Sequence, residues 1–366
     1  MAPGHDSGAR PTRPGPPTRR RHALVPRRDP FERLLSDTVR AGVCPGLVWA
    51  VGDARTTLSR GAVGVLDPAR PAGPVRHDTL FDVASLTKIL AVWAVTGTLV
   101  DAGKLDLAAP LGSYWPEAAG RPVAGVTAHH LLTHTAGMPL RANLRPLYGS
   151  DPQDIRDGVL AEPLRHRPGQ AVAYTDRAAL ILGYLTEHLT RRPLARLAEE
   201  RVWTPLGMTE TRYGPLPAAA RERCAPTEYD EESGRHLQGT VHDFSARALG
   251  GACGIAGVFT TAPDIGRFLR HLLDPVPGTF SAAWTAASLR VHTGGLVPPR
   301  GLFWHPAPYT DPADDVWAHF GFTGTGLWVS PARDRWAVLL TNRLYLTRDP
   351  GPLSRVRDVF RRLVFS

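Results

Sequence analysis

Residues 81–88 read FDVASLTK and stand directly before a long apolar run. The run predicts a buried helix over about 85–103, whose first turn carries Ser85. Residues three apart share a helix face, so the Ser85 hydroxyl and the Lys88 amine should be neighbours. A hydroxyl becomes a good nucleophile only when a base takes its proton, and an amine that burial keeps neutral can be that base. The segment therefore predicts a nucleophilic serine with a lysine partner.

The scarcity of lysine supports this interpretation. Of the 43 lysines and arginines, only Lys88 and Lys104 are lysines. Arginine does not lose its proton in proteins, whereas a lysine can. A composition that uses arginine almost everywhere thus retains lysine where a deprotonatable amine is useful. The structural alternative is a serine that caps the helix and a lysine exposed on its surface.

A second candidate segment is Tyr174-Thr175-Asp176, which follows a Pro-Gly turn and precedes a predicted helix over 178–190. The tyrosine can share a proton with Lys88, and Asp176 can orient that lysine. The alternative is a tyrosine buried in the core. Tyr309 begins the same three letters, but it lies in a loop rich in proline and aspartate.

The third candidate segment is His319-Phe320-Gly321, which leads into a predicted strand over 326–330. Glycine lets the backbone approach a substrate closely, and an N–H at a strand edge can point at a carbonyl oxygen. A competing His-Thr-Gly triplet starts at His292, but two prolines follow it instead of a strand. We therefore favour His319.

Both ends of the chain show the pattern of a sheet covered by helices. Helical spacing predicts helices over about 30–41 and 353–364, and strand-like segments joined by turn residues predict strands over 47–51, 57–65, 326–330 and 336–340. The middle of the chain has helical patterns over about 85–103, 127–134, 178–190 and 194–202. These patterns predict an α/β (α+β) fold in which an antiparallel sheet, flanked by the terminal helices, faces a mostly helical lobe. The active site should lie in the crevice between them.

Taken in order, Ser85-x-x-Lys88, Tyr174-x-Asp176 and His319-x-Gly321 resemble the serine β-lactamase and penicillin-binding-protein superfamily. The resemblance is strongest to class C β-lactamases and their esterase relatives. It extends over about residues 30–343 and includes the family-like segments LLTHTAGM at 131–138, PGQAVAYTD at 168–176, TPLGM at 204–208 and LGGACGIAGVFTTAPDIGRF at 249–268. It implies a β-lactamase/transpeptidase-like fold, with a sheet lobe at about 29–80 and 250–366 and a helical lobe at about 85–248.

The resemblance also implies roles for individual residues. Ser85 would be the nucleophile, Lys88 its base partner and Tyr174 the group that relays the proton to the leaving group. The backbone N–H groups of Ser85 and Phe322 would form the oxyanion hole.

The chain departs from the family pattern at the expected substrate-binding residues Asp176, His319, Phe320 and Gly321. Asp176 stands where the family usually has asparagine, so an amide donor is lost. Penicillin-recognising members have Lys-Thr-Gly at the third motif, where this chain has His319 and Phe320. This change weakens the site for a substrate carboxylate, whereas a neutral imidazole does not require an anionic substrate. We therefore expect little β-lactamase activity.

The net charge of +9 is concentrated at the N-terminus. Residues 1–28 contain seven arginines and one acidic residue among many prolines and glycines, which predicts a disordered basic tail before a catalytic domain over 29–366. A nucleic-acid role would depend on this tail alone, so we expect no nucleic-acid partner. No apolar stretch reaches the about 20 residues of a membrane helix, and no export signal follows the arginines, which favours a cytoplasmic protein.

The sequence shows no pattern for a metal or another cofactor. The three cysteines, Cys44, Cys224 and Cys253, have neither disulfide nor zinc spacing. His134 has no second ligand at metal-site spacing and is expected to tie a helix to a loop.

The leading hypothesis is a serine hydrolase that cleaves a small-molecule carboxylic ester or amide through an acyl-Ser85 intermediate. One alternative is a transacylase that passes the acyl group to an amine in a biosynthetic pathway. A further alternative is a catalytically silent binding module. Phe320, Phe322, Trp304 and Tyr148 can form an aromatic pocket or belong to the core. The sequence leaves the oligomeric state open.

Overall fold

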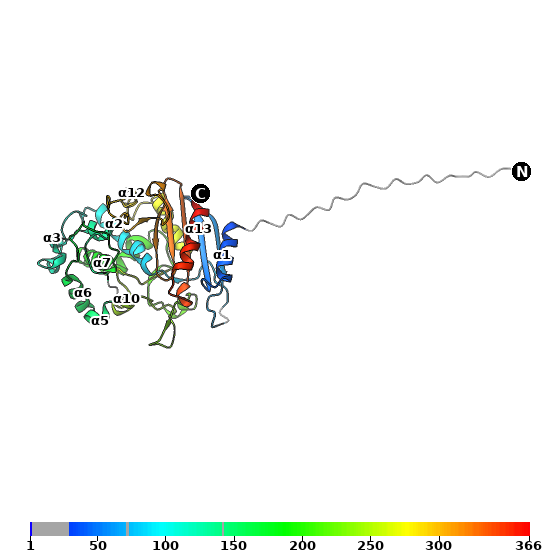
Figure 1. The fold of residues 1–366 in the computed structure, drawn as a ribbon, viewed down its shortest axis with the longest axis horizontal. Coiled ribbons are helices and arrows are strands. Elements are labelled where there is room, and N and C mark those ends of the chain that lie inside the picture. Colours follow the sequence, from blue (N-terminus) through cyan, green and yellow to red (C-terminus); the bar gives the residue numbers. More distant parts are fainter. Residues whose placement is uncertain (2–28, 71–72, 141–142) are drawn as a thin grey trace.

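A six-stranded antiparallel sheet joins the two ends of the chain (Figure 1). The computed structural model describes Met1 and residues 29–70, 73–140 and 143–366, so most of the predicted basic tail lies outside the described residues. In spatial order, the strands are β2 (Thr57–Gly64), β1 (Gly46–Gly52), β11 (Arg335–Thr341), β10 (Gly326–Ser330), β9 (Trp317–Phe320) and β8 (His305–Pro306). The pairing of β1 with β11 brings the N-terminal and C-terminal segments into one sheet.

Strand β1 is buried on both faces of the sheet. All seven of its residues are buried. Successive side chains of a strand point to opposite faces. Leu47 and Trp49 therefore contact the core under the terminal helices, whereas Val48 and Ala50 contact the larger core on the helical side. A strand buried on both faces has a continuous apolar sequence, which explains the run at 47–51.

The terminal helices α1 (Pro30–Arg40) and α13 (Gly351–Phe365) cover one face of the sheet side by side (Figure 1). The Asp29 side chain caps α1 by accepting a hydrogen bond from the Phe31 N–H at 2.9 Å. The rings of Phe31 and Phe360 meet edge to face, with centroids 5.6 Å apart. Both predicted terminal helices are therefore confirmed.

The other face of the sheet packs against α11 (Ala262–Leu273), and the helical region lies beyond it. Its helices include α2 (Ala94–Asp101), α3 (Leu111–Tyr114), α4 (Ala128–Leu132), α5 (Arg145–Tyr148), α6 (Pro152–Ala161), α7 (Asp176–Thr190), α8 (Leu194–Ala198), α9 (Ala218–Arg221), α10 (Phe244–Ala248) and α12 (Ala282–Ser288). The short strands are β3 (Phe81–Asp82), β4 (Arg212–Tyr213) and β7 (Val258–Thr260) in one sheet and β5 (Tyr229–Asp230) and β6 (Arg235–His236) in another.

The helix predicted over 85–103 is not regular. It begins as a 3₁₀ turn at Ala84–Leu86, continues as a π-helix at Lys88–Trp93 and becomes α-helical only in α2. Ala84 has a left-handed φ of 46°, and its N–H donates to the Asp82 carboxylate at 2.8 Å. Such irregular turns are frequent at functional sites. The whole segment is long and apolar enough to cross a membrane by length and composition, but 78% of it is buried within the fold, as expected of a core helix.

Packing between the terminal helices and the sheet yields a stability prediction. Phe360 is fully buried against Phe31 and Trp328. Phe360→Ala should lower the free energy of unfolding by about 3–5 kcal/mol, because it leaves a cavity in addition to losing buried apolar surface. Urea denaturation measures this change.

Leu363 on the same helix is the matched control, because 39% of its surface is exposed. Leu363→Ala should cost less than about 1 kcal/mol. Equal losses in the two variants would contradict the packing described here.

Candidate active site

A cleft of about 680 Å³ contains side chains from all three predicted motifs. Its lining includes the predicted site residues Ser85, Tyr174, Asp176, His319, Phe320, Gly321 and Phe322. Lys88 lies beneath this surface and is fully buried. The competing triplets are elsewhere: His292 bonds the Ala287 carbonyl, and Tyr309 lines a different cavity.

Lys88 connects three separate segments of the chain. Its Nζ lies 2.8 Å from the Ser85 Oγ, 3.0 Å from the Ile255 carbonyl oxygen and 2.8 Å from the Asp176 Oδ1. A protonated lysine has three N–H donors and no acceptor. Three acceptors at these distances therefore match the donors of an ammonium group.

The charge of Lys88 differs from the sequence-based expectation. Burial lowers its pKa, but the Asp176 carboxylate and then Tyr174 raise it more strongly, so the net shift is upward. This upward shift of the Lys88 pKa runs against the prediction that burial keeps the amine neutral. The reason is the partner at Asp176, since an opposite charge in contact favours the charged form of a buried group.

Tyr174 lies beside this lysine at the edge of the cleft. Its ring centroid is 5.4 Å from the Lys88 Nζ and 4.5 Å from the centroid of the His134 ring. His134 also bonds the adjoining chain, because its carbonyl accepts from the Ala173 N–H at 2.9 Å and its Nδ1 accepts from the Thr175 N–H at 3.4 Å. His134 thus fixes the backbone around Tyr174.

The start of α7 is anchored by an ion pair that sequence reasoning did not identify. Arg177, directly after Asp176, is buried and donates two hydrogen bonds of 2.8 Å to the Glu162 carboxylate. The Tyr148 hydroxyl donates to the same carboxylate at 2.7 Å. A bidentate contact of this kind fixes orientation as well as distance. It therefore sets the position from which Asp176 reaches Lys88.

The third motif packs directly on the chain before the nucleophile. A Cβ on Gly321 would lie 2.3 Å from the Val83 carbonyl oxygen, so only glycine fits. The hydroxyls of Thr323 and Thr325 donate to the carbonyls of Asp82 and Val83 at 2.7 and 3.1 Å. The sequence suggested that Gly321 allows a close approach of the backbone. In the structure, this glycine lets the sheet edge contact the turn that carries Ser85.

His319 is held as a neutral imidazole. Its Nδ1 lies 2.9 Å from the Phe303 carbonyl, which can only accept, so Nδ1 carries the proton. Burial first, and then the charges of His305 and Lys88, lower the pKa of His319 well below its ordinary value. Within the described part of the chain, its Nε2 has no hydrogen-bond partner. His319 therefore presents an acceptor and not a cation.

Other cleft residues were not identified from the sequence. They come from many separate segments and include Asn143, His242, Asp243, Phe244, Arg300, His305, Arg343, Arg348 and Arg357. These residues share no local spacing in the sequence, since only the fold brings them together. Of the predicted aromatic residues, Phe320 and Phe322 line the cleft. Trp304 belongs to the core, where it packs on Trp93, and Tyr148 lies outside the cleft lining.

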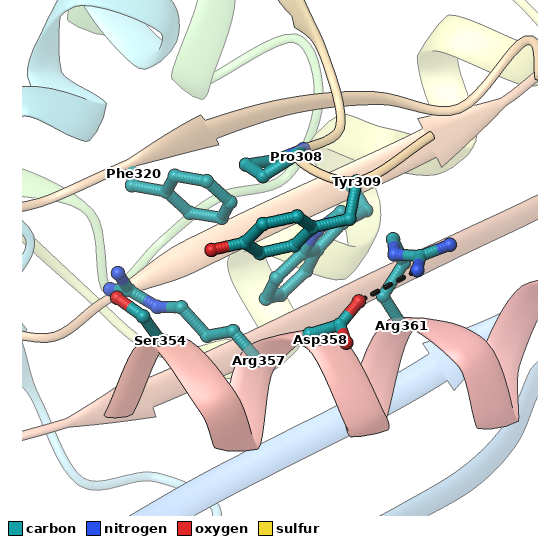
Figure 2. Close-up of a pocket in the computed structure, with 8 residues that line it drawn as sticks. Pro308, Tyr309, Phe320, Ser354, Arg357, Asp358 and Arg361 are labelled. Carbon is teal, nitrogen blue, oxygen red and sulfur yellow. Dashed lines mark hydrogen bonds and ion pairs between the residues drawn. The ribbon is translucent and has the colours of Figure 1, made fainter. Parts of the chain in front are cut away.

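A smaller cavity of about 180 Å³ adjoins the cleft and shares Phe320 and Arg357 with it. Figure 2 shows the Tyr309 ring between Phe320 and the side chains of α13. The Arg357 guanidinium carbon lies 4.6 Å from the Phe320 ring centroid. The side chains of Phe320 and Arg357 lie between the cleft and the smaller cavity. The Tyr309 segment therefore lies outside the cleft.

Comparison with known proteins identifies the family. The family model described as Beta-lactamase matches residues 31–359. The chain belongs to the beta-lactamase family. Members of this family are serine hydrolases, and the resemblance inferred from the three motifs is confirmed.

Relatives of this beta-lactamase-family chain include a putative carboxypeptidase and an amidase. A putative D-alanyl-D-alanine carboxypeptidase of Escherichia coli (strain K12) is 27% identical over 300 residues, which cover 72% of this chain and 69% of the relative. An N-acetylmuramyl-L-alanine amidase of Bacillus subtilis (strain 168) is 28% identical over 358 residues, covering 85% and 80%. Family membership therefore leaves the substrate open.

A solved structure, EstCE1, a hydrolase with promiscuous acyltransferase activity, superimposes with a TM-score of 0.71 at 19% identity. The match covers 89% of this chain and 97% of EstCE1. At this identity the likeness concerns the fold. The β-lactamase/transpeptidase-like α+β fold is therefore confirmed, with its antiparallel sheet and helices.

The contact between Lys88 and Asp176 yields a pH prediction. Asp176→Asn removes the negative charge that raises the Lys88 pKa, so that pKa should fall toward the value set by burial. If activity needs the ammonium form, it is lost as pH rises through the Lys88 pKa. The basic limb of kcat/KM against pH for an aryl ester should then move down by about one to three pH units.

Asp274→Asn is the control, since Asp274 is an exposed aspartate at the end of α11. Its pH profile should match that of the parent. A basic limb that does not move in Asp176→Asn would contradict the role of the charged lysine.

Proposed function

We propose that this protein cleaves a carboxylic ester or small amide through an acyl intermediate on Ser85. The observation that carries the proposal is the 2.8 Å contact between the Ser85 Oγ and the Lys88 Nζ at the floor of the cleft. A hydroxyl held by a buried cation, in a cleft beside a tyrosine, has the arrangement of an activated nucleophile.

In the first step, the Ser85 oxygen attacks the substrate carbonyl carbon and gives up its proton. An ammonium group has no lone pair and cannot accept a proton. The Tyr174 hydroxyl therefore relays the serine proton: its oxygen accepts that proton while its own hydroxyl proton passes to the departing oxygen or nitrogen. Water then attacks the acyl-serine and gives a proton back to the Ser85 oxygen through Tyr174, which releases the acid and free Ser85.

The negative charge on the attacked carbonyl oxygen needs donors that are already in place. We assign this role to the backbone N–H groups of Ser85 and Phe322. In the described chain, the Phe322 N–H makes no hydrogen bond. The Phe322 carbonyl accepts from the Arg343 guanidinium at 2.6 Å, so this backbone segment is fixed while its donor is free for substrate.

Transfer of the acyl group to an amine is the second candidate function. Two exposed aromatic side chains, Phe244 and Phe322, stand in the cleft lining and offer apolar surface to an acceptor. EstCE1, which shares the fold, is a hydrolase with promiscuous acyltransferase activity. An amine and water would use the same acyl-Ser85, so the acceptor alone distinguishes the two reactions.

The acyl-serine yields a direct prediction. When the protein is mixed with an activated aryl ester, its intact mass should rise by the mass of one acyl group as the aryl alcohol is released. Ser85→Ala should show neither change, because it lacks the attacking oxygen. Absence of an adduct and of aryl alcohol with several acyl lengths would contradict the proposal and favour a silent binding module.

Product analysis with added primary amines decides between the acceptors. Hydrolysis predicts the free acid at every amine concentration. An amide that forms in proportion to the amine, and that Ser85→Ala does not form, would establish transfer.

A further inference from the structure

One side of the cleft is bounded by the Phe320 side chain. Phe320 and Arg357 line both the cleft of about 680 Å³ and the cavity of about 180 Å³ that adjoins it. The Phe320 and Trp328 rings meet edge to face, with centroids 5.4 Å apart, and the Arg357 guanidinium carbon lies 4.6 Å from the Phe320 centroid. These contacts hold the Phe320 ring in place between the two spaces.

The cavity has the size and the lining to hold an apolar ring. Its wall includes the rings of Pro308, Tyr309 and Phe320, which Figure 2 shows together, and that of Trp328. An apolar protein cavity of about 150 Å³ is large enough to bind benzene. A cavity of about 180 Å³ therefore has room for one benzene ring.

The polar side chains on the same wall are bonded within the protein. Arg361 donates to the Asp358 carboxylate at 2.7 Å, and the Arg357 guanidinium donates to the Thr325 carbonyl at 2.6 Å. The Ser354 hydroxyl donates to the Pro350 carbonyl at 2.9 Å. The aromatic and proline rings thus supply the surface that is free to contact a ligand.

A row of rings leads from Tyr174 to this wall. The Tyr174 ring centroid lies 6.4 Å from that of His319, and the His319 centroid lies 6.2 Å from that of His305. The His305 and Phe320 centroids are 5.4 Å apart. Burial, followed by the Arg300 charge, lowers the pKa of His305 to about 4, so this histidine is neutral, as His319 is. The row therefore offers uncharged surface between Tyr174 and Phe320.

We propose that Phe320 sets the size limit for an aryl leaving group, and that the cavity behind it is the space into which a longer leaving group would extend. The inference rests on the proposed acyl-Ser85 chemistry, in which Tyr174 gives a proton to the leaving group. The part of the substrate that departs then lies along the row of rings, and the Phe320 ring stops it. A smaller residue at this position would join the two spaces.

Phenyl and 4-phenylphenyl esters of the same acid test this limit, because their leaving groups differ by one benzene ring. The parent protein should prefer the phenyl ester in kcat/KM. Phe320→Ala should raise the ratio of 4-phenylphenyl to phenyl ester kcat/KM by about 10- to 100-fold, the range expected for burial of an apolar ring. Phe320→Leu, which keeps a smaller apolar side chain, should give part of this gain. Thermal melting shows that each variant is folded.

Ser354→Leu tests whether the added ring occupies the cavity. Ser354 lines the cavity but not the cleft, so a leucine there fills part of the space without touching the cleft lining. Adding Ser354→Leu to Phe320→Ala should remove most of the gain. Phe244→Ala is the matched control, because Phe244 lines the cleft but not the cavity. It should leave the ratio of the parent unchanged.

Four results would each overturn the proposal. They are a parent that prefers the 4-phenylphenyl ester, an unchanged ratio in both Phe320 variants, a gain that survives Ser354→Leu, and an equal gain in Phe244→Ala. An equal gain when the added ring is placed on the acid would also overturn the assignment to the leaving group.

A binding measurement separates this inference from the proposed chemistry. By calorimetry, 4-phenylphenol should bind the Ser85→Ala/Phe320→Ala variant at least about tenfold more tightly than Ser85→Ala, whereas phenol should not show this gain. Equal binding of 4-phenylphenol to the two variants would overturn the role of Phe320. Failure of the parent to form an acyl-serine would overturn only the reaction.

Discussion

The candidate active site depends on one buried ammonium group. Lys88 is completely shielded from water, and burying an unpaired charge costs several kcal/mol. Its three acceptors come from the nucleophile turn, from the glycine-rich chain at Ile255 and from the start of α7 at Asp176. If one acceptor is displaced, the lysine loses part of the compensation for its burial. The requirement to satisfy this charge therefore holds Ser85, Ile255 and Asp176 in a fixed arrangement.

The remaining packing supports this arrangement from both sides. On the sheet side, Gly321 permits backbone contact, and two threonine hydroxyls bind the carbonyls that precede Ser85. On the helical side, the Arg177–Glu162 pair fixes the first turn of α7. The terminal helices pack on one face of the sheet, and the larger core packs on the other face. This packing holds the sheet edge in place at the cleft.

Patterns within short segments predicted much of the fold. The strand segment at 326–330 and the helical spacing at 353–364 correspond to β10, which is buried along its whole length, and to α13, which buries one face. The Ser85-x-x-Lys88 spacing also predicted the observed contact. The regular helix expected from Ser85 onward was wrong. The left-handed Ala84 bonds the nearby Asp82 carboxylate, and Lys88 in the π-helix bonds Ile255 and Asp176, which are far away in the sequence. The charge of Lys88 likewise depends on which residues the fold brings together.

Nuclear magnetic resonance of the lysine side chains tests the charge of Lys88 most directly. The chain has only two lysines, so labelling lysine with ¹⁵N gives two Nζ signals, and Lys104→Arg assigns them. The Lys88 Nζ should keep the chemical shift of an ammonium group from pH 6 to about pH 10, because its pKa is raised above the ordinary lysine value. A change to the shift of a neutral amine below pH 8 would contradict the charged centre on which the site is built.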